Sequence, residues 1–296
     1  MIALIVNPAA GRGAAQARAV SAEQALRALG PLRRYDTRAA GDERRCARAA
    51  CDDGATVIAV VGGDGSVHHV VRGLLEAAGP GNPTAIPLAI YAAGTGNDLV
   101  KSLGTPAHDV QAMTERVARR ATRHIDVGYI DDIPFVNAAG LGFDVEVLER
   151  MQRRSWLSGT AAYVVTALRA LFGYAGYHAS LITPQTRQDG AHLLTVFANG
   201  HTFGGTFRIA PDAQLDDGAL DCVNIRALSP LERPGVFLRA VRGTHLDHAA
   251  VTHCTGDTFT IIAPAPLSFE ADGERYGSRG AEIRVRVAAR QLMVIA

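Results

Sequence analysis

The chain has 296 residues, a length that allows two ordinary domains with a sizeable core in each. Its 30 Lys and Arg residues nearly balance its 29 Asp and Glu residues, which argues against a general nucleic-acid-binding protein. The four cysteines are scattered and form no CxxC pair, so structural zinc is not expected. Free thiols in a reducing cytoplasm fit this pattern better than disulfides do.

Two apolar segments resemble targeting or membrane sequences but are better explained as parts of the fold. The N-terminal residues MIALIVNPAAGRG lack a basic region and a long apolar core, so they indicate a strand and a turn rather than a signal peptide. The stretch Trp156–Tyr177 contains Arg169 and several small residues, which favours a buried or amphipathic helix over a membrane span. Its part Gly159–Phe172 is equally compatible with the wall of a lipid cleft and with a core helix.

Strand-like and helix-like runs alternate over the first 125 residues. Short apolar runs that end in turns predict strands, and alanine-rich or amphipathic runs predict helices between them. This βαβα order implies a parallel sheet covered on both faces, as in Rossmann-like α/β nucleotide-binding domains. The predicted strands are Ile2–Val6, Leu32–Asp36, Thr56–Val61 and Pro87–Ala92, and the predicted helices are Ala14–Leu29, Gly41–Cys51, Val67–Ala78, Asn97–Leu103 and Asp109–Arg120.

The pattern changes after about residue 125, and short strand-like runs dominate the rest of the chain. One or two helices are predicted around Asp144–Phe172 and another over Pro230–Gly243. Many short strands with Gly, Pro and Asp turns between them are typical of a β-sandwich. We therefore expect an α/β domain over residues 1–125 and a β-rich domain over residues 126–296, with a return of the last strand to the first domain left open. Two strands are predicted around the Asp-Asp turn of HIDVGYIDDIPFVNAAGLG, residues 124–142. The other predicted strands are Tyr177–Thr183, His192–Asn199, Ala219–Arg226, Thr258–Ala263, Leu267–Glu270, Ala281–Val287 and Gln291–Ile295.

Three glycine-bearing turns follow strands of the predicted parallel sheet: VNPAAGRG from Val6, GGDGS from Gly62 and AAGTGND from Ala92. Ligands of such sheets bind beyond the carboxyl ends of the strands. Glycine allows positive φ and lets backbone N–H groups approach an anion, and a following helix adds its positive N-terminal end. Each turn alone has an ordinary structural explanation, but three on successive strands predict a polyphosphate site.

The Walker motif GxxxxGK[ST] and the dinucleotide motif GxGxxG are both absent, so neither a P-loop protein nor an ordinary Rossmann dehydrogenase is expected. Without the P-loop lysine, phosphate charge has to be neutralised by backbone amides, other side chains and Mg²⁺. Mg²⁺ prefers oxygen ligands and keeps several waters, which Asp64 and Asp98 could hold. The sequence thus predicts glycines that hold phosphate and an aspartate that serves the metal.

The motifs NPAAGRG, GGDGS, GTGNDL, LDDGALD and ADGE occur in this order between Asn7 and Glu274. As a set they resemble the diacylglycerol kinase family, most closely its soluble bacterial lipid kinases, which are related to sphingosine and ceramide kinases and more distantly to NAD kinases. The resemblance covers nearly the whole chain. It implies a nucleotide-binding catalytic domain, a lipid-binding β-sandwich domain and an active site in the cleft between them.

The resemblance also implies which residues bind ATP. Thr37, in TRAAGD, matches a nucleotide-contacting threonine, although an ordinary loop threonine is the alternative. The implied ATP-binding residues are Asn7, Pro8, Gly11, Arg12, Thr37, Gly62, Gly63, Asp64, Gly65, Ser66, Val67, His68, Gly94, Thr95, Asn97 and Asp98.

Two neighbouring positions depart from the family pattern. The family commonly continues GGDG[ST] with x-Asn-Glu, whereas this chain has Val67-His68-His69. The departure puts the contacts of those two side chains in doubt, though not the backbone contacts. A zinc site at the two histidines is disfavoured, because neighbouring residues on a helix point in different directions.

Two motifs of the second half also gain a role from the resemblance. The family binds a structural Mg²⁺ at its LDDGALD loop, which here implies the Asp217 carboxylate and the carbonyls of Gln214 and Ala219; a simple turn is the alternative. The family places a catalytic carboxylate at the ADGE turn, facing the GGDG loop across the cleft. We expect Glu274 to be the general base, with Asp64 and Asp272 as rivals.

The sequence as a whole predicts an ATP- and Mg²⁺-dependent lipid kinase that phosphorylates a hydroxyl of a diacylglycerol-like or related lipid. The enzyme alternative is an NAD kinase, and the non-enzyme alternative is an inactive nucleotide- or lipid-binding regulator. The expected partners are the lipid and, peripherally, a membrane; no nucleic acid is expected, and a homodimer is one option for the oligomeric state. The expected location is cytoplasmic with transient membrane association.

Overall fold

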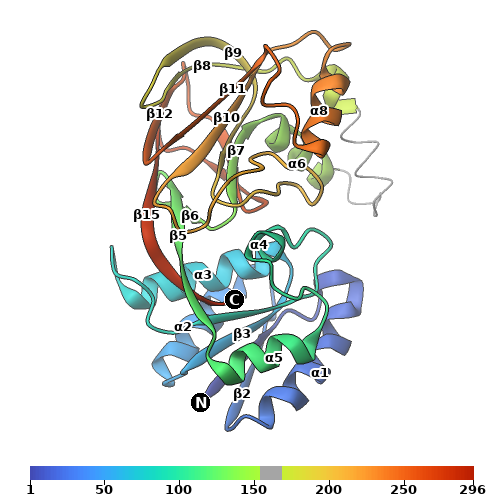
Figure 1. Ribbon diagram of the computed structural model, residues 1–296, viewed down its shortest axis with the longest axis vertical. Helices are drawn as coiled ribbons and strands as arrows, with labels where there is room; N and C mark the ends of the chain where they lie inside the picture. The colour runs from blue at the N-terminus through green and yellow to red at the C-terminus, as the bar shows by residue number, and fades with distance from the viewer. Residues whose placement is uncertain (154–168) are drawn as a thin grey trace. The chain divides into compact units, whose positions relative to one another are not determined.

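The computed structural model describes residues 1–153 and 169–296, which form two compact units. Unit 1 contains Met1–Val127, Leu215–Gly218 and Ala288–Ala296, and unit 2 contains Gly128–Gln214 and Ala219–Val287. The chain therefore crosses between the units four times, and both termini belong to unit 1 (Figure 1). The Gly159–Phe172 helix of the sequence analysis lies mostly outside the described residues.

Unit 1 is built on a parallel sheet with strand order β15-β4-β3-β1-β2. Each residue of β1, β3 and β4 is buried, because helices cover both faces of the sheet. The strands are β1 (Ile2–Val6), β2 (Leu32–Asp36), β3 (Val57–Gly62), β4 (Leu88–Ala92) and the end of β15 (Glu282–Ile295), and the helices are η1 (Ala10–Gly13), α1 (Ala14–Arg27), α2 (Asp42–Asp52), α3 (Asp64–Ala78), α4 (Asp98–Leu103) and α5 (Val110–Arg119).

The helices of unit 1 pack in pairs. Figure 1 shows α5 running beside α1, and the two share one core with alternate residues of the strands, such as Leu4 and Ala59. The second pair is α2 and α3, which approach so closely at Gly73 that a Cβ there would lie 2.5 Å from the carbonyl oxygen of Arg44. A glycine in the middle of α3 is therefore required by packing.

Unit 2 is an antiparallel β structure, in which all named strand pairs run in opposite directions. One core lies between its strands and includes Phe135, Phe197 and Phe259. A second core lies under α6 and α8. The elements are β5 (Thr122–Ile130, which begins in unit 1), β6 (Ile133–Phe135), β7 (Ala138–Gly142), α6 (Phe143–Arg153), β8 (Tyr177–Ile182), β9 (Arg187–Ala198), β10 (Leu220–Arg226), α8 (Arg233–Arg242), β11 (Val251–Gly256), β12 (Thr258–Ile262), β13 (Ser268–Ala271), β14 (Glu274–Gly277) and β15, with residues 169–173 also helical.

The predicted fold class, a mixed α/β domain followed by a β-sandwich-like domain, is confirmed, but several strands differ from expectation: β14 was not predicted, and residues 122–142 form the three strands β5, β6 and β7 rather than two. β11 was missed because its sequence VTHCTG is largely polar, which suits a strand that pairs only with β10 and exposes every second residue. The two predicted C-terminal strands are one long strand, β15. It pairs with β12 in unit 2 and, through Val294 and Leu88, with β4 in unit 1.

The tight contact at Gly73 generates a stability prediction. Gly73→Ala should lower the free energy of unfolding by about 1–3 kcal/mol, because the added methyl group overpacks the α2–α3 contact. Gly235→Ala in α8 is the matched control, since no atom lies within 4 Å of a Cβ there. The control should gain up to about 1 kcal/mol from better helix propensity. Urea unfolding of both variants measures the difference, and equal effects would contradict the packing argument.

Candidate active site

The three glycine loops meet at one edge of the parallel sheet. The register pairs Val6 with Val61 and Gly62 with Ala92, so β1, β3 and β4 end side by side. A helix begins within a few residues of each strand end, and Figure 1 shows α3 starting directly after β3. Unpaired N–H groups at helix starts and the helix dipole make such an edge suitable for an anion.

The glycines of the second and third loops serve close packing rather than positive φ. A Cβ on Gly63 would lie 3.1 Å from the Cα of Gly94, and a Cβ on Gly94 would lie 2.7 Å from the Cα of Gly63. None of Gly62, Gly63 and Gly94 has a positive φ. The two loop backbones are therefore in contact, which any side chain at these positions would prevent. In the first loop Gly11 does have a positive φ, of 59°.

Asp64 joins the second loop to the third. Its carboxylate accepts hydrogen bonds from the backbone N–H groups of Asn97 and Asp98, both at 2.8 Å. These are donors at the start of α4, where a carboxylate is stabilised by the unpaired amides and the helix dipole. Gly96 leaves room for this contact, because a Cβ there would lie 2.6 Å from Oδ2 of Asp64. The position of Asp64 in GGDGS predicts a metal-binding or catalytic carboxylate, whereas this structural role depends on the distant residues Asn97 and Asp98.

The third loop is closed by its own asparagine. Asn97 has a φ of 52°, and its side chain donates to the carbonyl of Gly94 at 2.9 Å and accepts from the amide of Gly94 at 3.1 Å. These two hydrogen bonds between Asn97 and Gly94 close the turn within the loop itself. Asp98, which follows, is buried and contacts Nζ of Lys101 at 3.2 Å. Thr95, at the tip of the loop, is exposed.

A buried glutamate joins the first loop to the second. Oε1 of Glu43, in the first turn of α2, accepts hydrogen bonds from Nδ2 of Asn7 at 2.9 Å and from Oγ of Ser66 at 2.8 Å. Glu43 is only 1% exposed, and its Oε2 has no hydrogen-bond partner among the described residues. Sequence analysis missed Glu43, because an acidic residue in the first turn of a helix is common and signals no particular site.

The other predicted ATP-binding residues differ in accessibility. Thr37 is buried at the end of β2, and its amide donates to the carbonyl of Val6 at 2.9 Å. The side chains of Val67 and His68 are also buried, so a ligand at this loop would meet their backbone. Pro8 is exposed, Gly11 and Gly65 are half-buried, and the side chain of Arg12 lies outside the described residues.

His68 is buried, whereas its neighbour His69 is only half-buried. The two rings lie edge to face with centroids 5.2 Å apart. Burial, and then the neighbouring His68 ring, lower the pKa of His69. Over residues 1–153 and 169–296, no three His, Cys, Asp or Glu side chains gather as a metal site would require.

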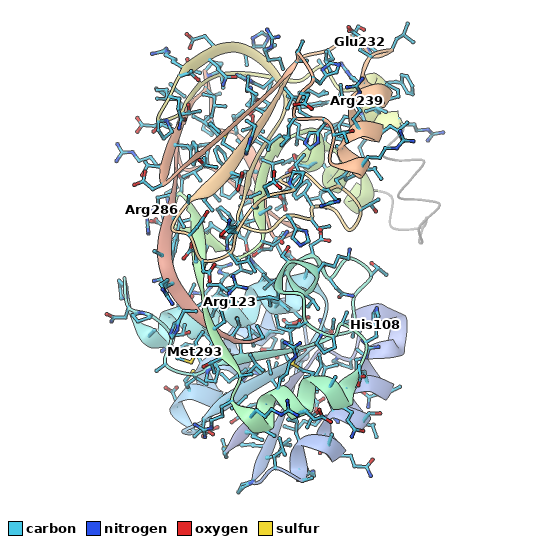
Figure 2. All side chains as sticks on the ribbon, viewed as in Figure 1. His108, Arg123, Glu232, Arg239, Arg286 and Met293 are labelled. Atoms are coloured by element: carbon cyan, nitrogen blue, oxygen red, sulfur yellow. The ribbon has the colours of Figure 1, made fainter. Side chains whose placement is uncertain are left out.

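The Asp216-Asp217-Gly218 turn is fixed within unit 1 by two long-range contacts. Arg123, labelled in Figure 2, forms a two-point ion pair with Asp216 at 3.0 and 2.8 Å. The hydrogen bonds from Arg123 lower the pKa of Asp216. The amide of Gly218 donates to the fully buried carboxylate of Asp126 at 2.7 Å, and the amide of Arg290 donates to the same carboxylate at 2.6 Å. Asp126, another residue that sequence analysis missed, thereby connects three distant segments of the chain.

The predicted metal ligands lie in this turn or next to it in the sequence. Asp217 is exposed, and Gln214 and Ala219 flank the Leu215–Gly218 segment. A carboxylate and two carbonyl oxygens are hard ligands of the kind that Mg²⁺ prefers, so the donor chemistry fits. The fixed conformation of the turn, with Gly218 at a φ of 76°, adds the rigidity that a small cation requires.

In unit 2, the hairpin between β13 and β14 carries two of the candidate bases, Asp272 and Glu274, and their surroundings differ. Asp272 and Gly273 have φ values of 51° and 85°, as the two central residues of a tight hairpin turn do. The Asp272 carboxylate accepts backbone N–H groups of residues 136–138, the shortest from Asn137 at 2.9 Å. Asp272 is thus a structural anchor of the turn. Glu274, the first residue of β14, is half-buried and is the better candidate for a reactive carboxylate.

Comparison with known proteins assigns the chain to a family. Residues 1–130 match the diacylglycerol kinase catalytic domain, and residues 137–296 match the YegS C-terminal NAD kinase beta sandwich-like domain. A diacylglycerol kinase of Mycobacterium tuberculosis is 30% identical over 299 residues, which cover 99% of this chain and 94% of that protein. The chain belongs to the diacylglycerol kinase family.

Other members of the diacylglycerol kinase family support the assignment. A diacylglycerol kinase of Bacillus subtilis is 26% identical over 276 residues, or 93% of this chain and 89% of that protein. Crystal structures from Bacillus anthracis that carry the diacylglycerol kinase name share the fold. One has a TM-score of 0.80 at 23% identity, with 99% of this chain and 94% of that one covered, and another has a TM-score of 0.73 at 18% identity. The family predicted from the five motifs is thus confirmed.

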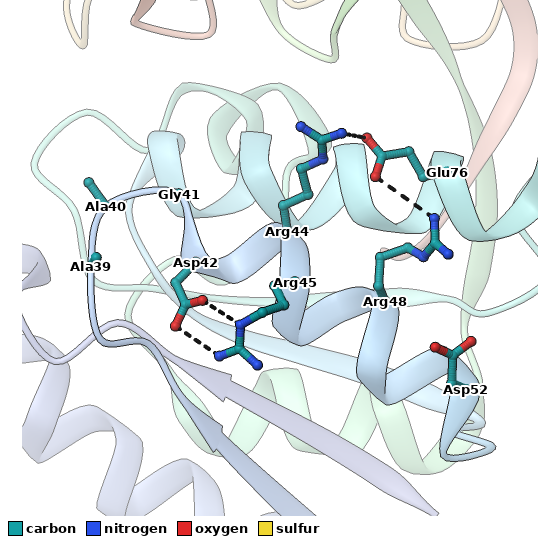
Figure 3. A pocket seen from close by; sticks show the side chains of 9 residues that line it. All are labelled: Ala39, Ala40, Gly41, Asp42, Arg44, Arg45, Arg48, Asp52 and Glu76. Carbon is teal, nitrogen blue, oxygen red and sulfur yellow. Dashed lines mark hydrogen bonds and ion pairs between the residues drawn. The ribbon is translucent and has the colours of Figure 1, made fainter.

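A surface pocket of about 510 Å³ lies along α2 and α3 of this kinase family member but does not coincide with the predicted ATP residues (Figure 3). Its arginines are matched by carboxylates: Arg44 contacts Glu76 at 2.6 Å, and Arg45 contacts Asp42 at 2.7 Å. This charge balance disfavours an anion site there. No helix of the described residues is both long and apolar enough to span a membrane.

The role of Asp64 generates the second prediction. Asp64→Asn should lower the free energy of unfolding by about 1–3 kcal/mol, because one oxygen that accepts an amide becomes an NH₂ group and leaves a buried donor unpaired. Asp98→Asn, on the same loop, is the matched control and should cost less. Thermal unfolding without ATP measures this structural effect apart from turnover. Identical melting of wild type and Asp64→Asn would contradict the proposed contact.

Proposed function

We propose that the protein is an ATP- and Mg²⁺-dependent lipid kinase, which transfers the γ-phosphoryl group of ATP to a hydroxyl of a diacylglycerol-like lipid. The observation that carries the proposal is the edge of the parallel sheet in unit 1, where Asp64 and Glu43 hold three loops together. Membership of the diacylglycerol kinase family supports a kinase, and the loops supply the anion-binding features that ATP needs.

Backbone amides are the main phosphate-binding groups in this proposal. The amides of Gly65 and Ser66 lie in the first turn of α3, where the helix dipole favours negative charge. The chain contains a single lysine, Lys101, so no P-loop type of phosphate contact is available from GGDGS itself. Asn7 and Thr95 complete the proposed ATP contacts of the first and third loops. Mg²⁺ bound with ATP would offset the remaining phosphate charge.

Phosphoryl transfer requires positioning and charge neutralisation more than covalent help from the protein. The lipid hydroxyl must lose its proton as its oxygen bonds to the γ-phosphorus and the bond to ADP breaks. We propose Glu274 as the base that takes this proton, because both oxygens of Asp64 accept backbone amides at the start of α4, and the carboxylate of Asp272 accepts amides of residues 136–138 as an anchor of the turn. The Asp217 loop would hold a separate Mg²⁺ that stabilises the conformation of the turn.

An NAD kinase is the second candidate, since the model matched by residues 137–296 is an NAD kinase-like sandwich. The two activities are separated by the acceptor. A labelled-ATP assay should therefore test a panel of lipids and NAD side by side. We further propose a cytoplasmic protein that contacts the membrane peripherally, since its acceptor would reside there. Vesicle sedimentation with and without diacylglycerol tests that contact.

The proposed base generates the third prediction. Glu274→Gln keeps the size of the side chain but removes the proton acceptor, so kcat should fall by about 10²–10⁴-fold. KM for ATP should stay close to wild type, since the mutated group does not hold the nucleotide. Glu282→Gln, an exposed position in β15, is the matched control for loss of one carboxylate. A Glu274→Gln enzyme with wild-type kcat would exclude Glu274 as the base.

The Asp217 loop generates the fourth prediction. If the loop binds Mg²⁺, excess Mg²⁺ should raise the melting temperature of the wild type through ligand linkage, and Asp217→Ala should lose that increase. Asp216→Asn is the control, because Asp216 contacts Arg123 and is not a proposed ligand. Melting curves with Mg²⁺ and with EDTA measure the effect. An equal Mg²⁺ shift in wild type and Asp217→Ala would show that the loop is only a turn.

A further inference from the structure

Two carboxyl groups of unit 2 lie side by side in the interior, and the proposed reaction does not use them. Asp144 is in the first turn of α6, and Glu270 is in β13, directly opposite Gly140 of β7. A Cβ on Gly140 would lie 1.8 Å from Oδ2 of Asp144 and 3.2 Å from Oε1 of Glu270. Both carboxyl groups therefore occupy the space above the Cα of Gly140, where only glycine leaves room for them.

The surroundings of Asp144 disfavour its ionised form. Both of its carboxyl oxygens are closed off from solvent and have no hydrogen-bond partner among the described residues. Its neighbour Glu270 is itself 2% exposed and is another acid. A buried carboxylate beside a second carboxylate is costly, and a single proton between the two removes most of that cost. Burial raises the pKa of Asp144 to about 7, while the amides of Asp144 and Val145 act in the opposite direction.

Glu270 also contacts the turn that carries the proposed base. Its Oε2 accepts the backbone N–H of Gly273 at 2.6 Å, and Ala271 pairs with Glu274 across the hairpin. Helix α6 contacts the next residue of the hairpin as well, through an ion pair between Glu149 and Arg275 at 2.5 Å. The position of the turn thus depends on where the Glu270 carboxyl group lies.

We propose that Asp144 carries a proton which it donates to Glu270, and that this shared proton holds Glu270 in the position that orients the turn before Glu274. Asp144 and Glu270 are then positioning residues. The part of the proposal that concerns Glu274 rests on the proposed function, whereas the shared proton does not. When the proton is lost, two buried negative charges face each other, and their repulsion should displace Glu270 from the amide of Gly273.

The other ionisable groups around the pair, among residues 1–153 and 169–296, are phenols or members of ion pairs and hydrogen bonds. Burial raises the pKa values of Tyr174 and of Tyr177 in β8, so both phenols stay neutral. On α6, Glu146 pairs with Arg150 at 2.6 Å and Glu149 pairs with Arg275. In β9, His192 is hydrogen-bonded to Asn224 and to the carbonyl of Ala179, and β7 contributes no ionisable side chain to this region.

The sign of the pH effect follows from the direction of the shift. The pKa of Asp144 is raised above the value of about 3.9 that an unfolded chain gives it. The stability that the bound proton supplies is therefore complete below about pH 4 and is lost as pH rises through about 7. The turn should lose its orientation in the same upper range, so kcat should fall above about pH 7.

The test compares Asp144→Asn with wild type by thermal unfolding of the whole protein, without substrates, from about pH 5 to about pH 8. Wild type should melt on the order of 5 °C lower at the upper pH. Asp144→Asn should lack this decrease, because its amide can donate to Glu270 at every pH. Glu146→Gln is the matched control on the same helix and should retain it. A decrease in Asp144→Asn equal to that of wild type would overturn the shared proton.

A second variant and a second measurement keep the test decisive. If Asp144→Asn does not fold, Glu270→Gln takes its place, and it should also lack the pH-dependent decrease because the pair of acids no longer exists. For positioning, the decline of kcat above about pH 7 should be present in wild type and absent in the variant that folds. The same decline in both would overturn the positioning role. Absence of lipid kinase activity in wild type would instead refute the proposed function and leave the melting result valid.

Discussion

The carboxylate of Asp64 is the contact on which the proposed ATP-binding edge depends. It occupies both of its oxygens with the first amides of α4, and so attaches the start of α3 to the start of α4. The backbones of Gly63 and Gly94 can then meet without a side chain between them. A hydrogen bond from an amide to a charged acceptor is stronger than a neutral one, and at a helix start the dipole adds to it. Without the Asp64 contact, the loops would be restrained mainly by the strands that they follow.

Carboxylates that fix a loop by accepting backbone N–H groups also occur in other parts of the chain. Asp126 accepts amides from two segments that are distant in sequence, and Asp272 accepts amides from the segment before β7. In each case a buried or partly buried carboxylate fixes a loop through backbone donors, so the loop conformation does not depend on which side chains it carries. These loops are the ones with proposed functions: nucleotide binding, metal binding and the turn before Glu274.

Carboxylates that contact side chains have a different part in the structure. Glu43 connects Asn7 and Ser66 and so restrains the side chains of two residues in the proposed ATP-binding loops. The acidic group beside Ser66 therefore comes from α2 and not from α3, the helix that carries Ser66. Asp144 and Glu270 are the opposite case. They are two neighbouring buried acids, and the proposed shared proton would remove the repulsion between their negative charges.

The sequence by itself determined the family, most of the helices and strands, and the glycine loops at three strand ends, because periodicity and turn residues are local properties. It also identified Asp64 and Glu274 as residues of interest. Only the tertiary structure decided what those residues touch. Asp64 meets amides 33 and 34 positions away, and Glu43 meets Ser66 23 positions away. Such contacts depend on strand register and helix packing, which bring distant segments together, and no local pattern encodes which carboxylate will find which amide.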